Sequence, residues 1–341
     1  AVWGINLSRH IARKTEETSL MIGERSATSS SRYRTSDIAE LRGLKSLKTK
    51  KVFQIKPYVL PGAVKNLRAT DPSAQTSFES GVDVRYGVTP NMTLDVSYNT
   101  DFAQVEGDQE QVNLTQFSQF FPEKREFFLE GSSVFEFGES AARRGGDARP
   151  PTILFYSRRV GLESGQPVPI IVGSKLAGKA GKTRIGMLNA LTDAVTFQNG
   201  KSVERSNFSV MRVKQDVLGN SNVGAIFVNK QTRVPGSGWD TYNRAAGVDF
   251  SYSPTKILNF QGFYARTWDP SIGDTDDARF LQATYSGAVY SGTVKFMDVE
   301  ENFEPRAGFV NRRGGLRGLR RYVAEGRARI NSNGKPVRYF L

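Results

Sequence analysis

Short runs that alternate between apolar and polar side chains recur along this chain from residue 81 to residue 299. In the run that begins at Met92, the residues Met92, Leu94, Val96 and Tyr98 are apolar or aromatic and the residues between them are polar. Successive side chains of a β-strand point to opposite faces, so a period of two predicts strands with one apolar and one polar face. The sequence therefore predicts an all-β fold.

The alternating runs are joined by turn sequences. GVDVRYGV, from Gly81, is separated from MTLDVSYNTDF by Thr89-Pro90-Asn91, which predicts a hairpin. Longer polar connections, at 198–205, 234–243 and 270–277, alternate with short ones. This order predicts an antiparallel up-and-down meander. Its later strands are predicted in ILFYSRRVG (from Ile153), PIIVGSKLAGKAG (from Pro169), TRIGMLNALTDAV (from Thr183), SNFSVMRVKQDV (from Ser206), SNVGAIFVNKQTR (from Ser221), RAAGVDFSYSP (from Arg244), LNFQGFYARTWD (from Leu258), ARFLQATYSG (from Ala278) and YSGTVKFMDVE (from Tyr290).

The composition favours a membrane location for these strands. No apolar run reaches the roughly 18 residues that a membrane-spanning helix needs. The mean hydropathy of −0.43 is compatible with a barrel, because only the lipid-facing side of each strand must be apolar. Tyr98, Tyr252 and Trp268 lie near strand ends, where aromatic girdles form. We therefore expect a transmembrane β-barrel in the outer membrane of a Gram-negative bacterium, in contact with outer-membrane lipid and lipopolysaccharide.

The alternation stops between residues 103 and 151, where the chain becomes acidic and aromatic. A short helix is predicted over 112–121, ended by Pro122. A segment of this length is too long for a hairpin loop, so it predicts an insert that plugs or narrows the barrel or caps one mouth. We treat 1–341 as a single barrel domain with this insert. Upstream, WGINLSRHIARK and FQIKPYVLPGAV are predicted strands, and residues 24–50 a loop.

The run LDVSYNTDFAQVEGDQEQVNLTQFSQFFPEKREFFLEGSSVFEF, followed by LFYSRRVG, resembles the bacterial outer-membrane barrel family called domain of unknown function 5916. WGINLSRHIARKTEE, LRGL, KPYVL and NFEPRAGFVNRR extend the resemblance over most of the chain. Thr100 and Glu126 stand where the family pattern has proline. The resemblance implies a barrel that continues beyond Leu341, and it implies that a family 9 carbohydrate-binding-like domain commonly precedes the barrel. The chain itself lacks that domain, and Ala1 opens directly into a strand-like segment without a secretion signal, as expected for a mature or excised piece.

Charged residues in and next to the insert are the candidates for a lumen or constriction site. The carboxylates could hydrolyse a glycoside as a pair or bind Ca²⁺. The alternative is that Glu123, Glu126 and Glu130 form ion pairs with the neighbouring basic residues and fix the insert to the barrel wall. The carboxylates are Asp101, Glu106, Asp108, Glu110, Glu123, Glu126 and Glu130, and the basic residues are Lys124, Arg125, Arg158 and Arg159.

Metal and imidazole chemistry have little support. His10 is the single histidine and the chain has no cysteine, which excludes Cys/His and multi-histidine metal sites. We expect no cofactor and no metal, and we assign no catalytic residue.

The stretch RAGFVNRRGGLRGLRR is strongly basic, and the whole chain carries a net charge of +13. Arginine side chains bind phosphate oxygens well, so this stretch could bind lipopolysaccharide phosphates. The alternative is a flexible loop or a row of arginines in the lumen. No nucleic-acid-binding signature accompanies it, and we expect no nucleic acid partner. The anion-binding candidates are Arg312, Arg313, Arg317, Arg320 and Arg321.

The sequence thus predicts passage or uptake of a small solute across the outer membrane, with a saccharide suggested by the family's usual domain company. The alternatives are a carbohydrate-active hydrolase on a barrel scaffold, or a surface barrel with a binding or structural role. The prediction depends on one spatial assignment. Leu94, Val96, Val248 and Phe250 should point outward, while their polar neighbours face an enclosed aqueous interior.

Overall fold

The computed structural model gives the positions of most of the chain. It describes residues 3–14, 16–21, 39–43, 52–65, 74–100, 120–138, 152–163, 166–197, 200–236, 238–272, 276–287, 290–310, 319–329 and 336–340.

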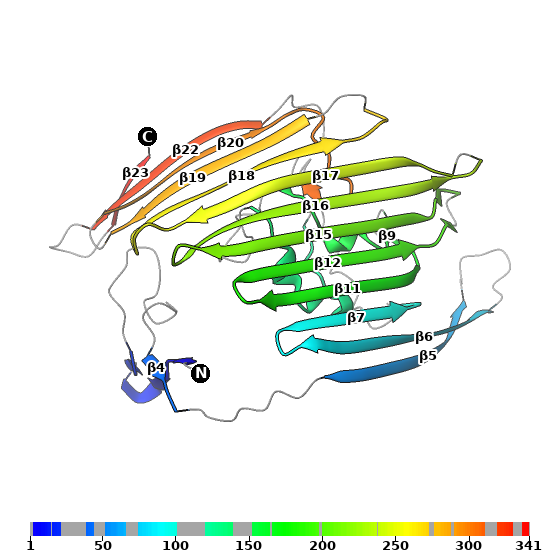
Figure 1. Cartoon of the computed structure of the whole chain (residues 1–341), viewed down its shortest axis with the longest axis horizontal. Helices are drawn as coiled ribbons and strands as arrows, with labels where there is room; N and C mark the ends of the chain where they lie inside the picture. Colours follow the sequence, from blue (N-terminus) through cyan, green and yellow to red (C-terminus); the bar gives the residue numbers. More distant parts are fainter. Residues whose placement is uncertain are drawn as a thin grey trace.

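One antiparallel sheet of 13 strands dominates the structure, and each of its strands pairs with the sheet strands that precede and follow it along the chain (Figure 1). The predicted up-and-down meander is therefore confirmed. Among the described residues, β5 and β23 are the two edges and do not pair with each other, so the described sheet is open. The strands in order are β5 (Phe53–Lys65), β6 (Ala74–Thr89), β7 (Met92–Tyr98), β11 (Ile170–Ala180), β12 (Thr183–Thr192), β15 (Ser206–Val217), β16 (Ser221–Val234), β17 (Gly238–Tyr252), β18 (Leu258–Trp268), β19 (Asp276–Ser286), β20 (Tyr290–Val299), β22 (Leu319–Arg329) and β23 (Pro336–Phe340).

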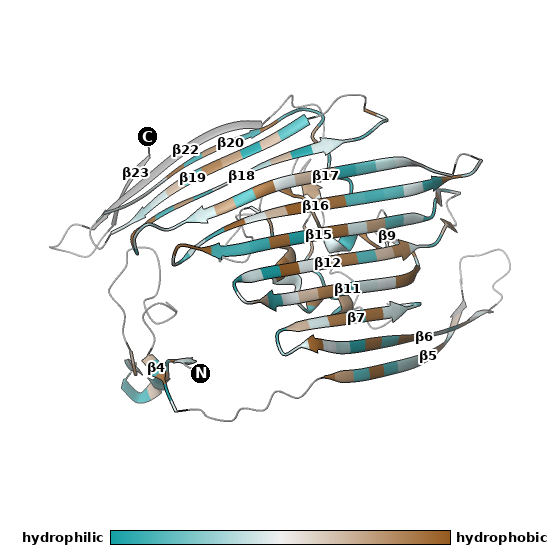
Figure 2. Cartoon of the chain, viewed as in Figure 1, coloured by the Kyte–Doolittle hydropathy of each residue, from teal (hydrophilic) through white to brown (hydrophobic). Residues whose placement is uncertain are grey.

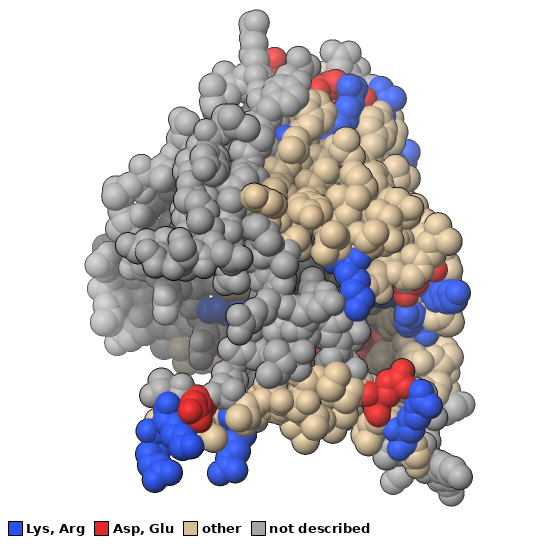
Figure 3. Space-filling model, turned by 90° about the vertical axis from the view of Figure 1, so that its left-hand side faces the viewer, with Lys and Arg blue, Asp and Glu red and all other residues tan. Residues whose placement is uncertain are grey.

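The two ends of the sheet differ in their connections. At the left in Figure 1, tight turns join the strands, and Gly181 opens the β11–β12 turn with a φ of 60° that suits the first position of a type II′ turn. Charged side chains gather at this end, where Lys179 and Arg184 both pair with Asp216. Figure 3 views the molecule from this end and shows clusters of basic and acidic side chains between areas of uncharged surface. The opposite end carries most of the longer connections. The predicted loop over 234–243 is wrong, because β17 already begins at Gly238 and extends the ladder with β16.

The N-terminal region forms two small antiparallel strand pairs outside the large sheet. β1 (Trp3–Ile5) pairs with β4 (Ala39–Leu41), and β2 (Ser8–Ile11) pairs with β3 (Glu16–Ser19). The prediction of one strand through WGINLSRHIARK is wrong. The run breaks at Asn6, whose side chain bonds both the backbone N–H and the carbonyl of Met21. The strand predicted in FQIKPYVLPGAV is confirmed as β5.

The face of the sheet that points away from the insert is apolar and exposed. Brown and teal residues alternate along the strands in Figure 2, as the period of two requires. Val96, Val248 and Phe250 are exposed on this face, as predicted, whereas Asp95 and Asp249 beside them are buried on the other. We call the following exposed residues the outer band: Val96, Met211, Val213, Phe227, Val248, Phe250, Leu281 and Val294.

The opposite, inner face is covered by the insert, meaning here the described residues 120–138 and 152–163. The insert contains α1 (Glu126–Leu129), the 3₁₀ turns η4 (Ser132–Phe135) and η6 (Ser157–Arg159), and β8 (Thr152–Ile153). Its buried Phe128, Phe135, Phe137 and Leu154 form one core with inward residues of the sheet. The predicted aqueous interior is therefore wrong for the middle of the sheet, where strand residues pack dry against the insert. These residues include Ala190, Phe208, Val210, Ile226, Val228, Ala245, Phe263 and Ala265.

The strand predicted in ILFYSRRVG is also wrong. Only Thr152 and Ile153 pair as a strand, with β21 (Phe309–Val310), and the chain then turns through η6. Leu154 and Val160 are both fully buried, because the turn at η6 brings both side chains into the core. The helix predicted over 112–121 lies outside the described residues except at its last two positions. None of the described helices is long and apolar enough to cross a membrane.

Glycines on the inner face make room for the aromatic rings of the insert. A Cβ atom on Gly247 would lie 2.5 Å from the Phe137 ring and 3.0 Å from Leu154. On β12, a Cβ atom on Gly186 would lie 2.9 Å from the Phe135 ring. At each of these two glycines the missing side chain leaves a shallow depression in the sheet, and an aromatic ring of the insert fills it. We call such a depression a seat.

We expect Gly247→Val to destabilise the fold by about 1–3 kcal/mol, because the added methyl groups would displace Phe137 from its seat. Urea unfolding in detergent micelles, followed by tryptophan fluorescence, would measure the change. Ala246→Val is the matched control, since Ala246 is the neighbouring residue and faces the other side of the sheet. Equal stability of the two variants would show that Phe137 does not depend on the space at Gly247.

Candidate functional site

A buried ion pair anchors one side of the insert. Arg212 on β15 and Asp249 on β17 form two hydrogen bonds of 2.7 Å. Arg212 Nε also donates to the carbonyl of Glu136 (3.1 Å), and the backbone N–H of Gly138 donates to Asp249 (3.1 Å). Gly224, on the strand between them, leaves space for both charges, since its Cβ would lie 2.6 Å from Arg212. The pair therefore holds residues 136–138 of the insert against the sheet.

A second anchor is the buried Lys175 on β11. Its Nζ atom lies 3.2 Å from Asp95 and donates to the backbone carbonyls of Glu130 (2.8 Å) and Phe127. These contacts give the ammonium group several oxygen partners, which a buried charge requires. Lys175 thus fixes the backbone of the α1 region against strand β11 of the sheet.

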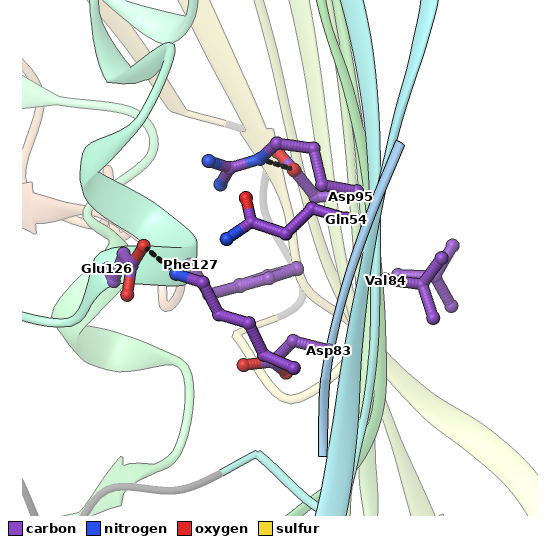
Figure 4. A pocket seen from close by; sticks show the side chains of 9 residues that line it. Gln54, Asp83, Val84, Asp95, Glu126 and Phe127 are labelled. Atoms are coloured by element: carbon purple, nitrogen blue, oxygen red, sulfur yellow. Dashed lines mark hydrogen bonds and ion pairs between the residues drawn. The ribbon is translucent and has the colours of Figure 1, made fainter. Parts of the chain in front are cut away.

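Beyond Lys175, toward the β5 edge, the insert contacts the sheet through more exposed ion pairs. Lys56 on β5 pairs with Glu126 at 2.7 Å, and Arg85 on β6 bonds Glu130 at 2.7 Å. Arg85 Nε also donates to Asp95 (2.7 Å). Figure 4 shows the cleft between these parts, with Glu126 and Phe127 on the insert and Val84 on the far face of the sheet. The cleft is lined by Gln54, Lys56, Asp83, Arg85, Asp95, Glu126 and Phe127, together with Val84 and Val96, which belong to its strands but carry their side chains on the outer face.

Glu123 is used inside the insert. It accepts hydrogen bonds from Arg125 Nε (2.8 Å), Arg125 Nη2 (2.7 Å) and Ser157 Oγ (2.6 Å). Burial alone would raise the pKa of Glu123, but the bonds and positive charge of Arg125, with Ser157, leave this pKa below its ordinary value. Arg125 also donates to the carbonyls of Ser157 and Val160. The group therefore joins the two described parts of the insert.

The predicted site residues thus separate into two groups. Glu126 and Glu130 face the wall, whereas Glu123, Arg125 and Arg158 hold the insert together, Arg158 by donating to the carbonyl of Pro122 (3.0 Å). The predicted pairing of the glutamates with neighbouring basic residues is found for Glu123 and Arg125, but Glu126 and Glu130 pair with strand residues. Three further placements complete the set: Arg159 donates to the carbonyl of Gly308, Lys124 is half-buried, and Asp101, Glu106 and Asp108 lie outside the described residues.

Six wall residues at this interface were not predicted. Each is a charged residue at an inward position of a strand that also carries apolar side chains. Such isolated inward charges are a usable signal, because a buried charge needs a partner. They are Lys56, Arg85, Asp95, Lys175, Arg212 and Asp249.

The arginine-rich stretch can be placed only in part. Arg312, Arg313 and Arg317 lie outside the described residues, and Arg320 and Arg321 lie in β22, whose side chains are not among the described ones. Anion binding by these arginines stays a prediction.

The geometry offers little to a glycoside hydrolase. The general acid of such an enzyme needs a raised pKa, so that it stays protonated. The pKa of Glu126, like that of Glu123, lies below its ordinary value, because Lys56 donates a hydrogen bond to its carboxylate. In the described part of the chain, no group of three or more acidic or histidine side chains could hold a metal ion.

We expect Arg212→Met to destabilise the fold by about 3–5 kcal/mol, because it leaves Asp249 buried without its partner. The double variant Arg212→Met/Asp249→Leu should recover much of this loss, since no unpaired charge remains. Unfolding in urea measures both changes.

Arg184→Met is the control for an exposed ion pair, and it should cost about 1 kcal/mol or less. An Arg212→Met variant as stable as this control would show that the buried pair does not anchor the insert.

Of the comparisons with known proteins, the family model agrees with the sequence resemblance. A search among curated proteins finds no match. One solved structure, in-vitro folded OmpT, an outer membrane protein of Vibrio cholerae, overlaps 83% of this chain and 97% of its own length at 10% identity, with a TM-score of 0.29. An overlap at this TM-score supports no inference. The family model for domain of unknown function 5916 matches residues 53–268, which run from the start of β5 to the end of β18. The chain belongs to this family.

Proposed function

We propose that the sheet is the wall of an outer-membrane β-barrel through which a small solute passes, and that the insert narrows the passage. The observation that carries this proposal is the outer band. A water-soluble protein rarely exposes a large continuous apolar surface, whereas a membrane barrel needs one.

The outer band has the dimensions and the flanks of a lipid-facing surface. On β17, the outward side chains from Ala246 to Tyr252 span roughly 20 Å at about 3.3 Å per residue, close to the apolar height of about 25 Å in outer-membrane barrels. Tyr252 and Phe260 stack on this face, and Tyr285 is exposed further along the sheet. Tight turns at one end and longer connections at the other are typical of such barrels.

The insert supports the passage part of the proposal. It is anchored to the inner face by buried charges, so it would stay in place while solutes move past it. Charged side chains at a narrow point select solutes by charge. We propose that Glu126, Glu130 and their partners Lys56 and Arg85 form this selective region.

The lipid-facing assignment predicts that Val248→Arg makes folding into lipid vesicles less favourable by about 2–4 kcal/mol, because a charge would enter hydrocarbon. Leu218→Arg is the control, since Leu218 is highly exposed in the β15–β16 turn and should tolerate a charge. If the two variants fold equally well into vesicles, the outer band does not face lipid.

The passage assignment predicts that replacing residues 104–150 with a short flexible linker raises conductance and weakens solute selectivity. The measurement is single-channel recording in planar bilayers, made on protein that shows the heat-modifiable gel mobility of a folded barrel. An unchanged conductance and selectivity in the folded variant would show that the insert does not narrow a passage.

A further inference from the structure

We propose that solutes pass through the cleft between the insert and strands β5–β7, and that the cleft favours solutes with both a positive and a negative group, such as amino acids and short peptides. This inference rests on the proposed function. It adds the route and the chemical class of the solute.

Two basic side chains of the sheet meet two glutamates of the insert across the cleft, and Asp83 and Asp95 also lie on the sheet side. Lys56 and Arg85 project from the sheet, and Glu126 and Glu130 face them from the insert at 2.7 Å. A solute with a single charge could pair with the basic side chains or with the glutamates only, and would leave the other set without its partner. A zwitterion can replace both partners at once, so each set keeps an opposite charge. The arrangement also orients such a solute across the cleft.

The ion pairs that close the cleft are accessible to water. The side chains of Lys56 and Glu126 are 43% and 63% exposed, and those of Arg85 and Glu130 are 22% and 45% exposed. Arg212 and Asp249 are only 0% and 6% exposed. Exposed pairs contribute little to stability and exchange with competing ions, whereas the buried pair does not open without a large cost. The closing pairs can therefore open by rotation of their side chains.

The backbone of the insert need not move when these pairs open. Lys175 holds the carbonyls of Phe127 and Glu130 on the inner side of the closing residues. The two glutamates thus project from a fixed backbone, which keeps their positions defined while their side chains move.

The inward side chains of the sheet also favour passage at the β5–β7 side. The inward residues of β5 and β6 at the cleft include Gln54 and Asp83, which are polar. The inward residues of β15 and β16 include Val210 and Val228, which are buried in the dry core. A charged solute that moves past β5 and β6 keeps polar partners, whereas a solute that moved past β15 and β16 would lose them.

Ion selectivity tests the two sets separately. The full chain is placed in a planar bilayer under a KCl gradient, and the reversal potential is measured. Glu126→Gln/Glu130→Gln should shift selectivity toward anions, and Lys56→Gln/Arg85→Gln should shift it toward cations. Lys179→Gln/Arg184→Gln is the control for the basic pair, because it also removes two positive charges from exposed ion pairs, at the turn end, and should shift the reversal potential less.

Solute preference is measured by the swelling of proteoliposomes. The wild-type protein should admit alanylalanine faster than a neutral sugar of similar size. Each double variant should reduce this preference by roughly two- to thirtyfold, the range expected from losing two exposed ion pairs.

A tether gives an independent test, because the chain has no cysteine. Lys56→Cys/Glu126→Cys, joined by a short bis-maleimide, should block dipeptide entry. Unchanged entry after tethering, or equal reversal potentials in all variants of a conducting protein, would overturn the inference and leave the proposed function intact. A folded protein that conducts neither with nor without residues 104–150 would instead overturn the proposed function.

Discussion

Strands that are apolar on both faces must have both faces covered, and this constraint shapes the whole structure. On β16, Ile226 and Val228 point inward and Phe227 points outward. The insert covers the inner side of these strands with its own aromatic core. The outer side carries the exposed apolar residues that the proposal assigns to lipid.

Covering the inner face with a segment rather than a second sheet creates a problem of hydrogen bonding. Most of the described insert is irregular, so many of its backbone carbonyls lack partners in a strand or helix. Lys175, Arg125 and Arg212 donate to several of these carbonyls, and each is itself paired with a carboxylate. The buried charges therefore satisfy the insert as well as anchor it, as buried polar groups generally must.

The period of two was sufficient to predict the strands from β11 to β20 and their order. It failed for Ile153 to Gly161, where the apolar residues enter the core from a turn. It also could not show whether the inner face of the sheet contacts water or the insert, because the contacts of the insert are set by the tertiary fold. A signal existed in Ala225-Ile226-Phe227-Val228, an uninterrupted apolar run of the kind found in strands covered on both sides. For the site, the glutamates of the insert were predicted, but their partners come from strands distant in sequence, which spacing alone does not reveal.

The pairing of β7 with β11 brings Tyr98 beside Val172, across the entire insert. The other neighbours in the sheet are joined by shorter connections, so their hairpins can form locally. Closing the β7–β11 joint carries a greater entropic cost, which the burial of the insert can offset only after the segment has collapsed onto the sheet. Assembly of this joint and capture of the insert are therefore one coupled event, and a chain in which the insert failed to pack would be left as two separate groups of strands.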